Sequence, residues 1–186
     1  MLNAQEVGGA PADLIVFPEG ACHKEIQEAS TKNPNSIIVG AIVEDGRSRG
    51  LLIHHGQNKI EYLKVESDDR TEGSQNVQQC PVYEMPDICI GVLICKDIDS
   101  VEFARKVIDR IKSSSCALKL LCVPADMMSD WFSDEKLPPK YEGVHVVLCN
   151  HTKTYQFRCQ SFVTDMLGNK INVQKQHKPV YAQLPS

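Results

Sequence analysis

The chain has 186 residues, with 24 acidic side chains, 20 basic side chains and a formal net charge of −4. Hydrophobic residues make up 42% and charged residues 24%, a balance that excludes disorder, collagen and coiled coil and is typical of a globular protein. The mild acidity argues against a dedicated nucleic-acid binder, which needs a basic stripe to release counterions. The length predicts a single domain over residues 1–186.

The compartment is inferred from the start of the chain and from the eight cysteines. Residues 1–7 have neither a basic start nor an apolar core, so they do not predict a signal peptide. The apolar runs are much shorter than the roughly 20 residues that span a membrane. The cysteines lie mostly within apolar runs, where a free thiol behaves as a small hydrophobic group, and no Cys-x-x-Cys occurs. We therefore expect a cytoplasmic protein with reduced cysteines.

Short apolar runs that end in Pro, Gly or a charged residue predict strands along most of the chain. Continuous runs of this kind are typical of strands that are covered on both faces. Two of the turns between them, at 55–58 and 166–169, are predicted to close hairpins. In chain order, the predicted strands are 14–17, 36–43, 51–53, 60–65, 88–95, 118–123, 144–149, 161–164 and 170–173.

Helical periodicity is clearest over residues 100–114, where apolar side chains recur on one face. Asp99 followed by Glu102 predicts the cap at the start of this helix. A weaker helix is predicted over residues 22–30. Strands alternating with helices predict a mixed α/β fold with helices packed on the sheets. The polar stretch 66–79 has no periodicity and predicts a long loop, a type of segment that often carries function.

Three side chains with complementary chemistry stand at the carboxyl ends of predicted strands. Glu19 follows the run Leu-Ile-Val-Phe-Pro, Lys64 lies at the end of strand 60–65, and Cys95 follows Ile-Gly-Val-Leu-Ile. Open α/β sheets bind their ligands beyond these ends. A thiol becomes a nucleophile when a base takes its proton, and a nearby cation stabilises the thiolate and any later oxyanion. We therefore expect the carboxylate, the amine and the thiol to form one nucleophilic site.

The residues around these side chains carry a family resemblance. Residues 12–19, Ala-Asp-Leu-Ile-Val-Phe-Pro-Glu, resemble the glutamate motif of the nitrilase, or carbon–nitrogen hydrolase, superfamily. Residues 62–64, Tyr-Leu-Lys, resemble its Tyr-x-Lys motif, and residues 91–97, Gly-Val-Leu-Ile-Cys-Lys-Asp, resemble its nucleophile motif. The three motifs occur in the family's order. Further segments that resemble the family are 121–125, 147–150 and 161–170.

The resemblance implies a nitrilase-like α-β-β-α sandwich with mixed sheets and an amidase-type hydrolase of non-peptide carbon–nitrogen bonds. It implies that Cys95 is the nucleophile, that Glu19 is the general base and that Lys64 stabilises the tetrahedral oxyanion. The backbone N–H of Lys96 would be a second oxyanion donor, and Glu72 is the candidate for an acid that the family places in the loop after the lysine.

The implied substrate is a small amide or nitrile. Attack by the thiol would release ammonia or an amine and leave a thioester, which water then hydrolyses to an acid. We expect no cofactor, no metal, and neither a nucleic-acid nor a membrane partner.

The chain departs from the family pattern in several respects. Few residues precede the glutamate strand, where the family has a further central strand and a long helix, so we expect the first strand to be absent. Lys96 follows the nucleophile where an aromatic residue is usual, and the segment 127–139 is short. A missing strand leaves a sheet edge whose backbone groups need covering, often by another chain. Together with the family's association through helices, this predicts a homodimer or a higher homo-oligomer.

Other functions are compatible with the same residues. The chain is a non-catalytic nitrilase-like binding or regulatory protein if it keeps the triad residues within a reduced pocket. It is a cysteine hydrolase of another kind if Asp13 or His151 acts as the base. A set formed by His145, Cys149, His151 and Cys159 has side chains that suit zinc, but its spacing fits no familiar finger, and a histidine at a strand end is more often hydrogen-bonded or exposed.

Overall fold

The computed structural model describes residues 12–65, 80–126, 137–150 and 160–173. The predicted loop 66–79, and Glu72 within it, lie outside these ranges, as do His151 and Cys159. Within the described ranges, no helix is long and apolar enough to cross a membrane.

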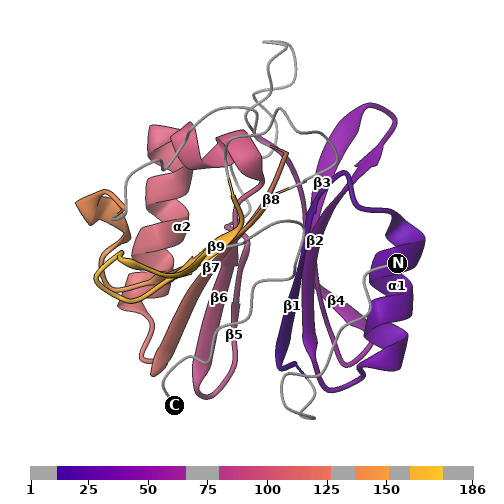
Figure 1. Ribbon diagram of the computed structural model, residues 1–186, viewed down its shortest axis with the longest axis horizontal. Coiled ribbons are helices and arrows are strands. Elements are labelled where there is room, and N and C mark those ends of the chain that lie inside the picture. The colour runs from indigo at the N-terminus through magenta and orange to yellow at the C-terminus, as the bar shows by residue number, and fades with distance from the viewer. Residues whose placement is uncertain (1–11, 66–79, 127–136, 151–159, 174–186) are drawn as a thin grey trace.

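Two β-sheets pack face to face, and each carries one long helix on its outer side (Figure 1). The first sheet has the order β1-β2-β3-β4, in which β1 and β2 are parallel and the other neighbours are antiparallel. Its helix, α1, connects β1 to β2 and covers the outer face. The elements of this half are β1 (Leu14–Glu19), α1 (His23–Lys32), β2 (Ile37–Glu44), β3 (Arg47–His54) and β4 (Gln57–Leu63).

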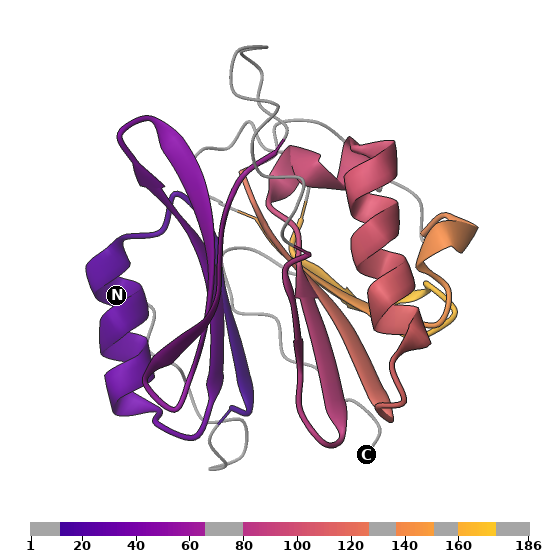
Figure 2. The same ribbon diagram turned by 180° about the vertical axis from the view of Figure 1, so that it is seen from behind.

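The second sheet has the order β10-β9-β8-β7-β6-β5, with three parallel strands at its centre. The helix α2 connects β6 to β7 and lies on the face away from the first sheet, as the view from behind shows (Figure 2). Two mixed sheets between two helical layers confirm the predicted α-β-β-α sandwich. The strands of this half are β5 (Val82–Glu84), β6 (Ile88–Val92), β7 (Leu118–Ala125), β8 (His145–Asn150), β9 (Phe162–Thr164) and β10 (Lys170–Val173), and its helices are η1 (Cys95–Asp99), α2 (Val101–Ser113) and η2 (Pro139–Tyr141).

The structure differs from the predicted elements in several places: β3 and β4 begin at Arg47 and Gln57, earlier than the predicted strands 51–53 and 60–65, and the short helices η1 and η2 were not predicted. β5 was not predicted, because three residues are too short to show a periodicity. The strand predicted over 88–95 ends at Val92, since the next two apolar residues are buried in the core without extending the strand. The predicted cap at Asp99 is wrong, because Ser100 occupies the N-cap position and makes no side-chain cap hydrogen bond.

The close packing of α2 on β6 requires a glycine. A Cβ at Gly91 would lie 2.6 Å from Ile111 Cδ1 and 2.9 Å from Val107 Cγ1. Those distances are below van der Waals contact, so the helix lies directly on the strand backbone only because no side chain intervenes. This packing fixes the position of η1, the turn that connects β6 with α2.

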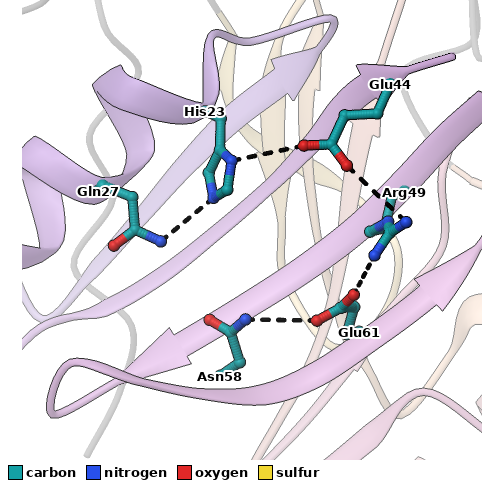
Figure 3. A network of polar contacts seen from close by, with 6 residues as sticks. All are labelled: His23, Gln27, Glu44, Arg49, Asn58 and Glu61. Atoms are coloured by element: carbon teal, nitrogen blue, oxygen red, sulfur yellow. Dashed lines mark hydrogen bonds and ion pairs between the residues drawn. The ribbon is translucent and has the colours of Figure 1, made fainter.

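The outer surface of the first sheet carries a polar network that connects α1 with three strands (Figure 3). His23 on the helix lies 3.5 Å from Glu44, and Arg49 contacts both Glu44, at 3.8 Å, and Glu61 on β4. These side chains are all at least one-third exposed, and exposed ion pairs contribute roughly 0–1 kcal/mol each. The stability of this sheet therefore depends mainly on the apolar cluster beneath α1, which includes Phe17 and Ile26.

Candidate functional site

The carboxylate of Glu19 lies at the end of β1, and the residue is 7% exposed. Its Oε1 accepts two hydrogen bonds, one from Lys64 Nζ at 2.8 Å and one from Ser48 Oγ at 2.5 Å. The chain turns away immediately afterwards at Gly20, whose φ of +78° suits a residue without a side chain. A strand end thus holds a buried carboxylate between an ammonium group and a hydroxyl group.

Lys64 directly follows β4, and the antiparallel pairing of β3 with β4 brings it beside Ser48. Its backbone N–H donates to the carbonyl oxygen of Ser48 at 2.8 Å, which extends the ladder by one residue. The side chain is 14% exposed and pairs with Glu19. A lysine in such a place needs a partner because an unpaired buried charge is costly, and the carboxylate supplies it.

Cys95 begins η1 and is 6% exposed. Its φ is +46°, in the left-handed region that residues with a side chain seldom adopt. Backbone strain of this kind is concentrated at active sites and other functional positions. The thiol makes a hydrogen bond with the side chain of Glu19 and another with the backbone of Asp126, and it is close enough to Lys64 to respond to its charge. The structure therefore brings the three side chains from the three motifs together.

The surroundings of the thiol raise the pKa of Cys95 to about 11. Burial is the largest cause, and the negative charge of Glu19 adds to it, while the charge of Lys64 and the backbone hydrogen bond from Asp126 act in the opposite direction. At neutral pH the thiol is therefore protonated. A nucleophilic thiolate needs a base within reach, and the carboxylate of Glu19 is the base in contact.

A buried aspartate connects the end of β4, next to Lys64, with η1, the turn that begins at Cys95. Asp97, in η1, has no exposed surface, and its Oδ1 accepts the backbone N–H of Val65 at 2.9 Å. Its Oδ2 accepts the Tyr62 hydroxyl at 3.0 Å and the backbone N–H of Ile94 at 3.3 Å. Burial and the charge of Asp97 raise the pKa of Tyr62 well above its usual value, so the phenol remains a donor. One carboxylate thus anchors the residues that flank both Lys64 and Cys95.

Tyr62 reaches this position across a glycine on the neighbouring strand. Gly50 on β3 is paired with Tyr62 on β4, and a Cβ on Gly50 would lie 2.5 Å from Cε1 of the tyrosine ring. The ring therefore lies over the bare backbone of β3, with its hydroxyl at Asp97.

Of the other residues singled out in the sequence, Lys96 lies next to the thiol, whereas His145 and Asp13 lie elsewhere in the fold. Lys96 is the second residue of η1 and is partly buried, so its backbone N–H belongs to the same turn as the thiol. His145 is buried and its Nδ1 lies 2.8 Å from the carbonyl oxygen of Thr164, a hydrogen-bonded role within the sheet. Among the described residues, no group of three or more His, Cys, Asp or Glu side chains could hold a metal ion. Asp13 is exposed at the opposite end of β1 from Glu19.

Sequence reasoning did not single out Ser48 for the site. The stretch Arg-Ser-Arg-Gly in which it lies has no catalytic signature, and the contact with Glu19 depends on the register of β3. Asp97 lies within the motif 91–97 that resembles the nucleophile motif, and it caps the turn by accepting the backbone N–H of Ile94. Its bonds to Tyr62 and Val65 were not predicted, since they join segments more than thirty residues apart.

Comparison with known proteins places this geometry in a known fold. An amidase from Nesterenkonia AN1, in a cysteine-to-alanine mutant, is 18% identical and superposes with a TM-score of 0.67 over 88% of this chain and 73% of that chain. Nit3 of Saccharomyces cerevisiae, a member of branch 10 of the nitrilase superfamily, is 14% identical and superposes with a TM-score of 0.66 over 90% of this chain and 74% of that one. The chain has the nitrilase fold.

The nitrilase fold is thus recognised by its shape, because no family model matches the sequence and no curated protein matches it. A glutamate-to-glutamine mutant of the same Nesterenkonia amidase, 18% identical, superposes with a TM-score of 0.65 over 88% of this chain and 76% of that chain. In that protein, acrylamide has added to the active-site cysteine. Identity of this order shows the fold of the chain.

Proposed function

We propose that the protein is a member of the nitrilase superfamily and a carbon–nitrogen hydrolase of the amidase type, with Glu19, Lys64 and Cys95 as its catalytic residues. The observation that carries the proposal is that a carboxylate, an ammonium group and a thiol from three separate segments meet in one buried place. The sequence motifs around them and the nitrilase fold support the same function.

The proposed reaction begins with a protonated thiol, because the pKa of Cys95 is raised. Glu19 takes the thiol proton while the sulfur forms a bond with the amide carbon and the carbonyl π electrons move to oxygen. The ammonium group of Lys64 and the backbone N–H of Lys96 stabilise that oxyanion. The intermediate collapses, the carbon–nitrogen bond breaks, and the leaving nitrogen receives the proton from Glu19, which leaves a thioester.

The second half of the reaction uses the same base. Glu19 takes a proton from water, and the hydroxide oxygen adds to the thioester carbon. When the carbon–sulfur bond breaks, the sulfur recovers its proton from Glu19 and the carboxylic acid product leaves. We propose Glu72 as an additional acid in this site, a role that rests on its place in the sequence after the lysine motif.

The proposal is tested by intact-protein mass spectrometry with short aliphatic amides, carbamoyl amines, aliphatic nitriles and acrylamide. We expect an acyl adduct from at least one amide or an alkyl adduct from acrylamide, mapped by peptide analysis to Cys95. Cys95→Ala should abolish both adducts and ammonia release, and Glu19→Gln should abolish hydrolysis. Cys22→Ala is the matched control, because this exposed cysteine lies before α1 and outside the site. Turnover that survives Cys95→Ala would contradict the mechanism.

A second candidate, a non-catalytic binding or regulatory protein, is favoured by one observation. The thiol is 6% exposed and has a raised pKa, which are properties of an unreactive cysteine. If Cys95 reacts with iodoacetamide no faster than the exposed Cys22 and no substrate in the panel is turned over, this second function replaces the first.

We also propose that the protein forms a homodimer or a higher homo-oligomer. A monomer in sedimentation at micromolar concentration would contradict this.

A further inference from the structure

Ser48 contacts both charged members of the proposed acid–base pair. Its hydroxyl group donates to Glu19 Oε1 at 2.5 Å, and its carbonyl oxygen accepts the backbone N–H of Lys64 at 2.8 Å. Ser48 lies on β3, two strands away from Glu19 on β1, so its side chain reaches Glu19 across the intervening strand β2, where Ser48 is paired with Val43 and Glu19 with Ala41. One residue that carries no charge thus holds the base and the cation in fixed relative positions.

The two hydrogen bonds at Glu19 converge on a single oxygen. Lys64 Nζ and Ser48 Oγ both donate to Oε1. We propose that Ser48 is a positioning residue of the general base: together with Lys64 it holds Oε1, so that Oε2 is the oxygen that exchanges the proton with Cys95. This inference rests on the proposed hydrolase function and adds to it the residue that sets the orientation of the carboxylate.

Lys64 by itself orients the carboxylate poorly. A lysine side chain has several rotatable bonds and a rotating ammonium group, whereas a serine hydroxyl stands one bond from a Cβ that the strand holds in place. Two donors at one oxygen, one of them on a short side chain, restrict rotation of the carboxylate about its terminal bond. Restriction of this kind matters for catalysis because a base acts only within hydrogen-bond reach of the proton it removes.

The test compares Ser48→Thr with Ser48→Val, two variants of the same shape that differ by the hydroxyl group and suit a strand. We expect the valine variant to lose about tenfold in kcat with KM unchanged, as expected for the loss of one hydrogen bond to a charged group that acts in the transition state. The threonine variant should restore kcat. Ser36→Ala is the control, since its hydroxyl group donates over the same 2.5 Å to the carbonyl oxygen of Ala12, at the other end of β1.

Two readouts separate this inference from the proposed function. The first is amide hydrolysis, and the second is the rate at which acrylamide alkylates Cys95, followed by mass spectrometry. If wild-type protein hydrolyses amides and the threonine and valine variants have the same kcat, the role of Ser48 is wrong and the hydrolase function stands. If no amide is hydrolysed but alkylation slows in the valine variant alone, Ser48 positions the base and the hydrolase function fails. Equal alkylation rates in the wild type and the valine variant would overturn the role of Ser48.

Discussion

Replacement of Asp97 by asparagine removes the charge from the anchor between the two sheets while it keeps the shape. In wild type, Oδ1 accepts the N–H of Val65, and Oδ2 accepts the N–H of Ile94 and the hydroxyl of Tyr62. The asparagine NH₂ group has to occupy one of these two oxygen positions. In either orientation it faces a backbone N–H, and two donors cannot bond with each other.

The expected cost follows from these contacts. One buried N–H loses its acceptor, which costs about 1–3 kcal/mol, and the remaining bonds lose the assistance of the charge. We expect Asp97→Asn to lower the free energy of unfolding by about 3 kcal/mol, which for a chain of this length lowers the Tm by roughly 6–12 °C. Tyr62→Phe removes one donor and leaves both backbone bonds in place, so it should cost less, about 1 kcal/mol.

Thermal and urea unfolding of the two variants measure this difference. A second readout is alkylation of Cys95. It should slow in Asp97→Asn because η1, which begins at Cys95, and Val65, which follows Lys64, are no longer both bonded to a carboxylate at residue 97. An Asp97→Asn variant that unfolds within about 2 °C of wild type, less than 1 kcal/mol at this size, would refute the role of Asp97 as an anchor. A larger loss of stability in Tyr62→Phe than in Asp97→Asn would refute it as well.

Further predictions concern the thiol and two glycines. Glu19→Gln removes a negative charge and releases Lys64 from its partner, so the pKa of Cys95 should fall below about 11, measured by thiolate absorbance against Cys95→Ser as the blank. The Cys95 thiol ionises near its ordinary pKa of 9.0 in the unfolded chain and near 11 in the folded chain, so the unfolded chain binds fewer protons between these pH values. The free energy of unfolding should therefore fall with rising pH, by up to about 2–3 kcal/mol. Urea titrations of Cys95→Ser should show a smaller loss. Gly91→Ala should lower the Tm by displacing α2 from β6. Gly50→Ala should displace Tyr62 and also slow alkylation of the Cys95 thiol. Equal alkylation rates in the two glycine variants would contradict the prediction for Gly50→Ala.

Much of the fold could be predicted because its signals are local. Strands appear as apolar runs, and the turn at His55 and Gly56 appears as a break between two of them, with both residues at positive φ in the structure. The meeting of Glu19 with Lys64 could be predicted because both residues stand at the carboxyl ends of predicted strands, where open α/β sheets bind their ligands.

The parts that could not be predicted depend on register and on long-range contacts. The bond from Ser48 to Glu19 exists only for one alignment of β3 with β2, and a shift by one residue would turn the hydroxyl group to the opposite face. The partners of Asp97 come from another strand and another sheet. The backbone conformation of Cys95 is imposed by the turn around it, and the identity of the residue gives no sign of it.

Asp97 joins two parts of the chain that each hold only some of the reactive groups. Glu19 and Lys64 come before Val65 in the chain, and Cys95 comes after Cys80. Neither part alone therefore contains the carboxylate, the ammonium group and the thiol. Under the proposed function, amide hydrolysis therefore requires the two parts of the chain to be joined. Two fragments produced separately from a cut between those parts should each lack amide hydrolysis and should regain it upon mixing, to the extent that they reassociate.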